Sequence, residues 1–171
     1  PRIVTIDLEA FEYDNGRLLE LGVAVWEAQA PKTIRVEHYV IAENCNLRNG
    51  RMVPDHRDHF LFGTSQTTPL ATAHAQLLGL LSLPGVALAG HGLQSDLDML
   101  ALSQLPLPEC PLVLDSALLH RQLERREETC SLERLLHSLG IEARFLHNAG
   151  NDAAYTLLAI LHMAGLRDLQ M

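Results

Sequence analysis

The chain has 171 residues, of which 47% are hydrophobic and 20% charged, and its formal net charge is −8 at pH 7. These values fit one globular domain with a sizeable core, so residues 1–171 are treated as a single domain. The three scattered cysteines exclude a disulfide framework and favour an intracellular protein, and no apolar stretch is long enough to predict a membrane span. An acidic chain also binds a polyanion poorly unless divalent cations neutralise its carboxylates.

The first forty residues predict three strands. Residues 3–6 form a β-rich run that ends at Asp7, residues 18–26 are apolar after a turn predicted at 14–16, and residues 33–41 alternate apolar with polar side chains. Sequential strands with short connections predict an antiparallel meander. Residues 44–65 are irregular and carry Arg48, Arg51 and Arg57, which either contact phosphates or pair with the acids of the same segment.

The second half alternates between helices and strands. Helices are predicted at 70–81, 93–102, 131–139 and 151–164, and short strands at 85–90 and 111–114. Ser131 is suited to cap one helix and Gly140 to end it. The order predicts an α/β fold, a mixed sheet flanked by helices, with ligand sites at the carboxyl ends of strands.

Three acidic motifs follow such strand ends. Asp7 and Glu9 lie two residues apart, so an extended strand presents both on one face. Asp96 follows the 85–90 strand, and His147 precedes Asp152 at the start of the last helix. Each motif alone has an ordinary explanation, because acids are common at frayed strand ends and in first helical turns.

Together the motifs predict a metal site. Oxygen ligands from several carboxylates select Mg²⁺ or Mn²⁺, and two such ions can stabilise both the attacking and the leaving oxygen of a phosphodiester. Histidine is suited to deprotonate water because its ordinary pKa lies near working pH. The pair His56 and His59 has no second pair at useful spacing, which argues against zinc.

The three motifs resemble those of the DEDDh (DnaQ-like) 3′–5′ exonuclease superfamily, which has an RNase H-like fold. Asp-x-Glu matches Asp7 to Glu9, the second motif matches His91 to Asp96, and the third matches His147 to Asp152. The resemblance implies that Asp7, Glu9, Asp96 and Asp152 hold two metal ions, and that His147 activates the attacking water.

The resemblance also implies residues that contact the substrate. Ala10 and Phe11 follow the first motif, Phe62 and Thr64 lie in a segment similar to the one that borders the terminal base, and His91 opens the second motif. Residues 53–64 and 146–153 look like a fungal branch that is linked to RNA interference and to mRNA export, which favours RNA slightly over DNA.

We therefore expect a two-metal 3′–5′ exonuclease that releases 5′ mononucleotides from single-stranded nucleic acid in the cytoplasm or nucleus. The alternatives are a non-catalytic RNase H-like binding module and a two-metal phosphoesterase acting on small oligonucleotides. The chain begins at Pro1, so we expect it to be part of a longer protein whose flanking regions could bind protein partners.

Overall fold

The computed structural model describes residues 1–109, 112–167 and 169. A six-stranded mixed sheet with the order β4-β3-β2-β1-β5-β6 forms its centre. The strands are β1 (Arg2–Phe11), β2 (Asp14–Glu27), β3 (Ile34–Ile41), β4 (Gln66–Thr68), β5 (Val86–Gly90) and β6 (Val113–Asp115). The helices are η1 (Ala42–Asn44), α1 (Leu70–Leu81), α2 (Gln94–Leu102), α3 (Ser116–Leu123), α4 (Leu132–Ser138) and α5 (Ala149–Met163).

The predicted mixed sheet is confirmed. Strand β2 pairs antiparallel with both β1 and β3, whereas β5 pairs parallel with β1 and with β6. The carboxyl ends of β1, β5 and β6 therefore meet at one edge of the sheet, where the acidic motifs were expected.

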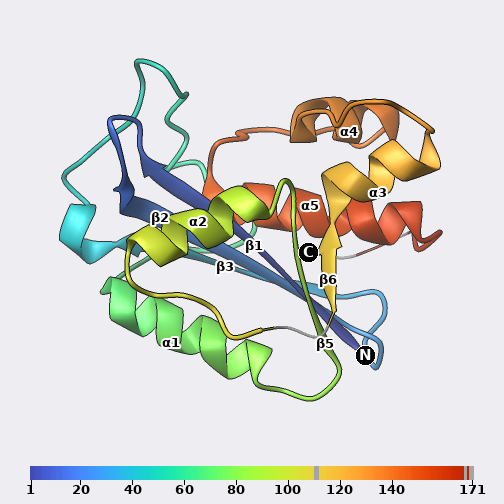
Figure 1. The fold of residues 1–171 in the computed structure, drawn as a ribbon, viewed down its shortest axis with the longest axis horizontal. Helices are drawn as coiled ribbons and strands as arrows, with labels where there is room; N and C mark the ends of the chain where they lie inside the picture. The colour runs from blue at the N-terminus through green and yellow to red at the C-terminus, as the bar shows by residue number, and fades with distance from the viewer. Residues whose placement is uncertain (110–111, 168, 170–171) are drawn as a thin grey trace.

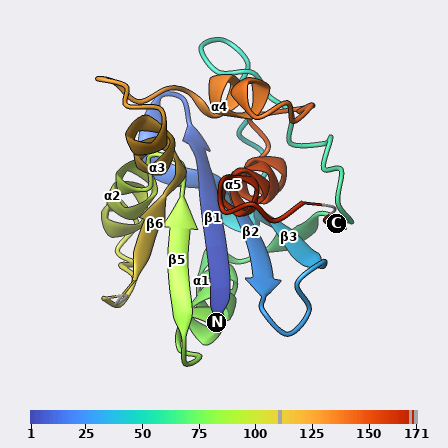
Figure 2. The same ribbon diagram turned by 90° about the vertical axis from the view of Figure 1, so that its right-hand side faces the viewer.

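Helices cover both faces of this sheet (Figures 1 and 2). Alternate residues of β1, namely Val4, Ile6 and Leu8, pack into a core with side chains of α1 and α2. The opposite face carries α5, whose Ala153 and Leu157 pack against β2 and β3. Because β1 alternates between two buried faces, its odd-numbered side chains point towards α5.

Some local predictions were wrong. The β1–β2 turn lies at Glu12 and Tyr13 rather than at 14–16, because β1 and β2 both extend further and shift register near their ends. The short strand β4 and the helix α3 were not predicted. The strand predicted at 111–114 begins outside the described residues, and the described part ends at Asp115 as expected.

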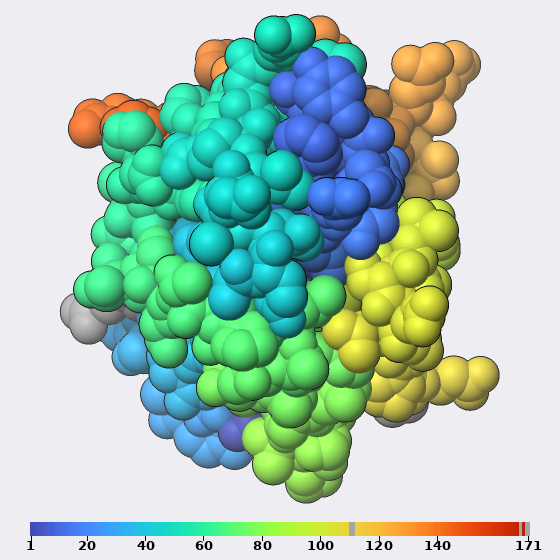
Figure 3. Space-filling model, turned by 90° about the vertical axis from the view of Figure 1, so that its left-hand side faces the viewer, coloured from blue at the N-terminus to red at the C-terminus, as the bar shows by residue number. Residues whose placement is uncertain are grey.

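Residues 44–65 form a long surface segment beside the β1–β2 hairpin, which is blue in Figure 3. Asn49 fastens the segment to this hairpin, accepting from Glu12 N at 2.9 Å and donating to Ala10 O at 2.9 Å. Asn148 and Asn151 of the α5 start donate to backbone carbonyls of His56, Arg57 and His59. The segment therefore joins the hairpin to α5.

No helix in the described part of the chain is long and apolar enough to cross a bilayer.

Candidate active site

Strand β1 supplies two carboxylates on the face that α5 covers. Thr5 marks this face, because its hydroxyl lies 2.9 Å from Ala153 O of α5. Asp7 and Glu9 follow at two-residue intervals along the strand. Their side chains therefore point to the same face of the sheet as that of Thr5. The predicted placement of both acids on one face is confirmed by this register.

Helix α5 brings the third motif directly over these acids. Its first residues approach β2 so closely that a Cβ on Gly22 would lie 1.8 Å from Ala149 O. A side chain on Gly150 would similarly collide with His38 and Phe60. Asn148 caps the helix by accepting from Asn151 N at 3.0 Å. Two glycines and a cap thus fix the start of α5 on the sheet.

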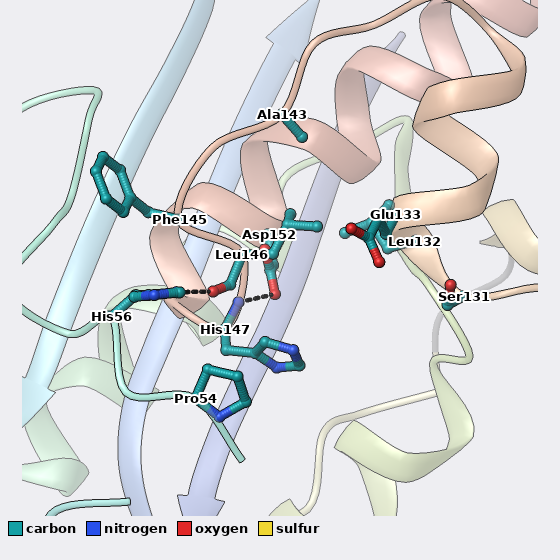
Figure 4. A pocket seen from close by; sticks show the side chains of 10 residues that line it. All are labelled: Pro54, His56, Ser131, Leu132, Glu133, Ala143, Phe145, Leu146, His147 and Asp152. Carbon is teal, nitrogen blue, oxygen red and sulfur yellow. Dashed lines mark hydrogen bonds between the residues drawn. The ribbon is translucent and has the colours of Figure 1, made fainter. Parts of the chain in front are cut away.

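This docking gathers Glu9, His147 and Asp152. One ligand atom from each residue lies within 4.8 Å of those of the other two. Nδ1 of His147 is 3.8 Å from Oε1 of Glu9, and the His147 side chain is 48% exposed, which leaves the imidazole accessible to solvent. The backbone N–H of His147 donates to Oδ2 of Asp152 at 2.9 Å (Figure 4).

Asp96 reaches the same edge from α2. It is buried, and its Oδ1 accepts from Leu8 N at 2.9 Å, between the two β1 acids in sequence. Asp115 supports the turn before α2, because its carboxylate accepts from Gly92 N at 3.1 Å and from Leu93 N at 3.0 Å. It also caps α3 through Ala117 N. Asp115 therefore positions the second motif.

His91 is engaged within the protein. Its Nδ1 lies 2.8 Å from Ser116 Oγ, and its Nε2 lies 2.9 Å from Cys130 O. With both ring nitrogens occupied, the geometry favours a role for His91 in joining the turn to α3 and to the segment before α4. Its contact with substrate stays a prediction.

Burial, together with nearby acids, raises the pKa of all four carboxyl groups. Burial, followed by repulsion from Glu20, Asp152 and Asp96, raises the pKa of Glu9 to about 9. Burial is also the largest cause for Asp96 and Asp152, whose pKa values rise to about 7. The pKa of Asp7 is raised well above its ordinary value by burial and by its neighbours Asp152, Asp96 and Glu9. The dependence of Asp7 and Glu9 on the other acids shows that the four carboxylates share one electrostatic environment.

The donor set fits divalent cations. Oδ1 of Asp152 is buried and has no hydrogen-bond partner among the described residues, although buried carboxylate oxygens are normally satisfied. Repelling carboxylates with one unsatisfied oxygen are stabilised when a cation lies between them. Asp7, Glu9, Asp96 and Asp152 would hold such ions, which would supply positive charge to a phosphodiester.

The remaining predicted substrate residues lie in different surroundings. The carbonyl of Ala10 accepts a hydrogen bond from Asn49. The ring of Phe11 packs edge-on against that of Tyr13, at 5.3 Å between centroids. Phe62 packs against Tyr155 of α5 at 5.7 Å. Thr64 lines a separate hollow of about 500 Å³. The substrate role of these four residues stays a prediction.

Two arginines of the 44–65 segment, Arg48 and Arg57, are bound within the protein. Arg48 pairs with Asp55 and Asp58, as the second sequence alternative expected. Arg57 is buried, donating to Cys45 O at 3.0 Å and to Leu47 O at 2.8 Å. The Arg57 guanidinium is therefore held inside the protein, whereas the Arg48 side chain remains 43% exposed.

Sequence reasoning missed Glu20, which lies opposite Glu9 in the β1–β2 register. Glu20 is buried and accepts from His38 Nε2 at 2.9 Å, from Ala149 N at 3.2 Å and from Arg57 Nε at 3.5 Å. It thus links β3, the 44–65 segment and the start of α5 directly behind the acid cluster. The one available signal was a charged residue within the apolar run of β2.

The sequence matches a family model described as the DNA polymerase III subunit epsilon-like, C-terminal domain of the DEDDh group, over residues 2–163. Two relatives are an uncharacterized nucleolar protein of Schizosaccharomyces pombe, C2C4.08, at 32% identity, and Good for full DBP5 activity protein 2 of Saccharomyces cerevisiae, at 28%. The alignments cover 94% and 89% of this chain, and 68% and 33% of those proteins.

The fold resembles that of exonuclease I. An E. coli exonuclease I–single-stranded DNA complex gives a TM-score of 0.61 at 15% identity, covering 96% of this chain and 40% of that one. A complex of the same enzyme with a dT13 oligonucleotide gives 0.57 at 13% identity, over 94% and 40%. Because the family model spans nearly the whole chain, this protein belongs to the DEDDh exonuclease superfamily.

Proposed function

We propose that the protein is a divalent-metal-dependent 3′–5′ exonuclease that removes 5′ mononucleotides from single-stranded nucleic acid. The observation that carries the proposal is the meeting of Glu9, Asp152 and His147 at the strand edge that also holds Asp7 and Asp96. A binding module gains nothing from these acids, because their mutual repulsion and burial destabilise the folded chain.

Each residue has a role that follows from its position. Asp7, Glu9, Asp96 and Asp152 would hold two Mg²⁺ or Mn²⁺ ions, which would supply Lewis acidity to the scissile phosphate. His147 takes the proton of the attacking water, and burial lowers its pKa, so the imidazole is neutral at physiological pH and able to accept that proton. The hydrogen bond from His147 N to Asp152 fixes the base relative to the metal-holding carboxylate.

The substrate class is proposed from the relatives. One exonuclease I structure is a complex with single-stranded DNA and another holds a dT13 oligonucleotide, and we propose that this chain also acts on single-stranded ends. RNA is slightly favoured over DNA by the sequence resemblance to a fungal branch, which the two yeast relatives support. The nucleolar relative supports a nuclear location.

The test is a gel assay with 5′-labelled single-stranded RNA and DNA of one sequence, in Mg²⁺, Mn²⁺ or EDTA. We expect a ladder that shortens from the 3′ end and requires metal. Asp152→Asn is the matched control, because an amide oxygen can still accept from His147 N while the negative charge is lost. Cleavage that persists in Asp152→Asn would contradict the site, and intact strands under all conditions would favour a binding module.

A further inference from the structure

The tip of the 44–65 segment, residues 50–53, is held to the rest of the protein by one carboxylate. Oε2 of Glu12, in the β1–β2 turn, accepts from Met52 N at 2.8 Å. The other three backbone N–H groups of the tip lie 3.2–3.4 Å from the same oxygen. Within the described residues, all hydrogen bonds of the tip are made to Glu12. We call these contacts the latch.

The tip is built as an anion-binding site whose anion belongs to the protein. Successive N–H groups that converge on one point form a nest for negative charge. Gly50 opens the nest with a φ of 129°, which an L side chain rarely adopts. The hydrogen bond from Met52 N is the largest cause of a lowered pKa of Glu12, and those from the rest of the tip act in the same direction. The carboxylate is therefore ionised at physiological pH, and its charge strengthens the latch.

The tip leads directly into a wall of the active site. Pro54, which follows it, lines the same cavity of about 420 Å³ as His147 and Asp152 (Figure 4). His56 also lines this cavity, and its Nδ1 contacts Leu146 O, the carbonyl next to His147. A proline fixes its own φ and restricts the residue before it, so the position of the tip is passed on to the wall.

The segment on either side of the tip has anchors of its own. Arg48 pairs with Asp55, and Asn148 donates to the carbonyl of His56 at 3.1 Å. Loss of the latch would therefore release the tip and the residue after it without unfolding the whole segment. A local release of this kind would loosen the active-site wall while the sheet and the acid cluster stay in place.

We propose that Glu12 is a positioning residue for the exonuclease reaction, because its carboxylate holds the tip on the β1–β2 hairpin and so fixes the wall beside the base His147. The effect on cleavage rests on the proposed function, whereas the latch is a property of the folded chain. Glu12 does not belong to the acid cluster, so metal affinity should not depend on it. If Glu12 only shapes a surface turn, His147 does not sense its loss.

Hydrogen exchange and histidine NMR test the latch without any cleavage. In Glu12→Ala the amides of the tip should exchange at least about tenfold faster, since one hydrogen bond to a charged group is enough to change the opening equilibrium by that factor. The imidazole resonances of His147, assigned from their loss in His147→Asn, should shift. Glu12→Gln keeps an acceptor oxygen but loses the charge, so both effects should be intermediate.

Glu43→Ala is the matched control. Glu43 is an exposed glutamate whose carboxylate accepts from one backbone N–H, that of Leu70, at 3.0 Å, and it takes no part in the latch. This variant should leave the tip amides and the His147 resonances as in the wild-type protein. Unchanged exchange in Glu12→Ala would overturn the proposal. Faster exchange without a shift at His147 would overturn it as well, because Glu12 would then shape only the turn.

Cleavage of a 5′-labelled single-stranded RNA then measures the consequence for the reaction. We expect kcat to fall about 10- to 100-fold in Glu12→Ala, the loss that a misplacement of about 1 Å can cause, while calorimetric Mn²⁺ affinity stays that of the wild-type protein. An equal kcat in both proteins would contradict the positioning role. A wild-type protein that cleaves no strand would reject the proposed function, and the exchange and NMR results would still support or overturn the coupling of Glu12 to His147.

Discussion

At the residue scale, His147 connects the backbone conformation to the chemistry. Its φ of 64° and the hydrogen bond to Asp152 turn the imidazole towards Glu9. Asparagine adopts this backbone region more readily than most residues, so His147→Asn removes the base with little added strain. We expect cleavage to slow roughly 100- to 10,000-fold, the usual contribution of a general base.

Metal binding separates the two possible roles of this histidine. If His147 acts only as the base, calorimetric Mn²⁺ affinity in His147→Asn should equal that of the wild-type protein. A variant that loses Mn²⁺ binding together with activity would show that the imidazole is a metal ligand. The geometry permits this role, because ligand atoms of His147, Glu9 and Asp152 lie within 4.8 Å of one another.

At the element scale, the seating of α5 on β2 determines whether the acids meet. Gly22→Ala would place a methyl group 1.8 Å from Ala149 O, so the start of α5 must move. We expect a loss of about 1–3 kcal/mol or more in the free energy of unfolding, together with weaker Mn²⁺ binding. Urea denaturation and calorimetry measure the two effects.

Gly79→Ala is the control for that substitution. Gly79 lies in α1, and a Cβ there meets no atom within 4 Å. Alanine should stabilise this helix by up to about 1 kcal/mol without changing metal affinity. A Gly22→Ala protein that behaves like Gly79→Ala would contradict the close docking of α5.

The buried ion pair behind the site gives a second prediction for the elements. Arg57→Met leaves Glu20 buried without its guanidinium, which should cost about 3–5 kcal/mol in the free energy of unfolding. Arg48→Met removes two ion pairs of a partly exposed side chain, with Asp55 and Asp58, and should cost at most about 1 kcal/mol for each pair. Equal losses in urea denaturation would show that Arg57 does not hold the 44–65 segment against the sheet.

These elements also show what the sequence could and could not predict. The spacing of Asp7 and Glu9, and the Ser131 cap with Gly140 after α4, are local signals, and each gave the correct element. Glu20 and Arg57 are 37 residues apart, and β4 is only three residues long, so no local pattern revealed their partners. Phe62 lies in a segment that resembles the family segment next to the terminal base, and its ring packs against Tyr155 of α5.

At the scale of the whole molecule, the net charge of −8 and the acid cluster make stability depend on metal and pH. The pKa values of Glu9, at about 9, and of Asp96 and Asp152, at about 7, lie above the unfolded values of about 4. Between these limits the three carboxyl groups bind more protons in the folded chain than in the unfolded chain. The stability that they contribute without metal therefore falls as pH rises from about 4 towards 9.

Thermal unfolding in EDTA at pH 5.5 and 8.5 tests this dependence. We expect the wild-type Tm to be at least about 3 °C lower at pH 8.5, the change that about 1 kcal/mol produces in a domain of this size. Millimolar Mg²⁺ should raise the Tm most at pH 8.5. More of the clustered carboxyl groups are ionised at that pH, and Mg²⁺ bound to the folded chain offsets their repulsion. Asp152→Asn should show a weaker pH dependence and a smaller response to Mg²⁺. A wild-type Tm that rises with pH in EDTA would mean that the carboxylates are not buried together, and the metal site would lose its physical basis.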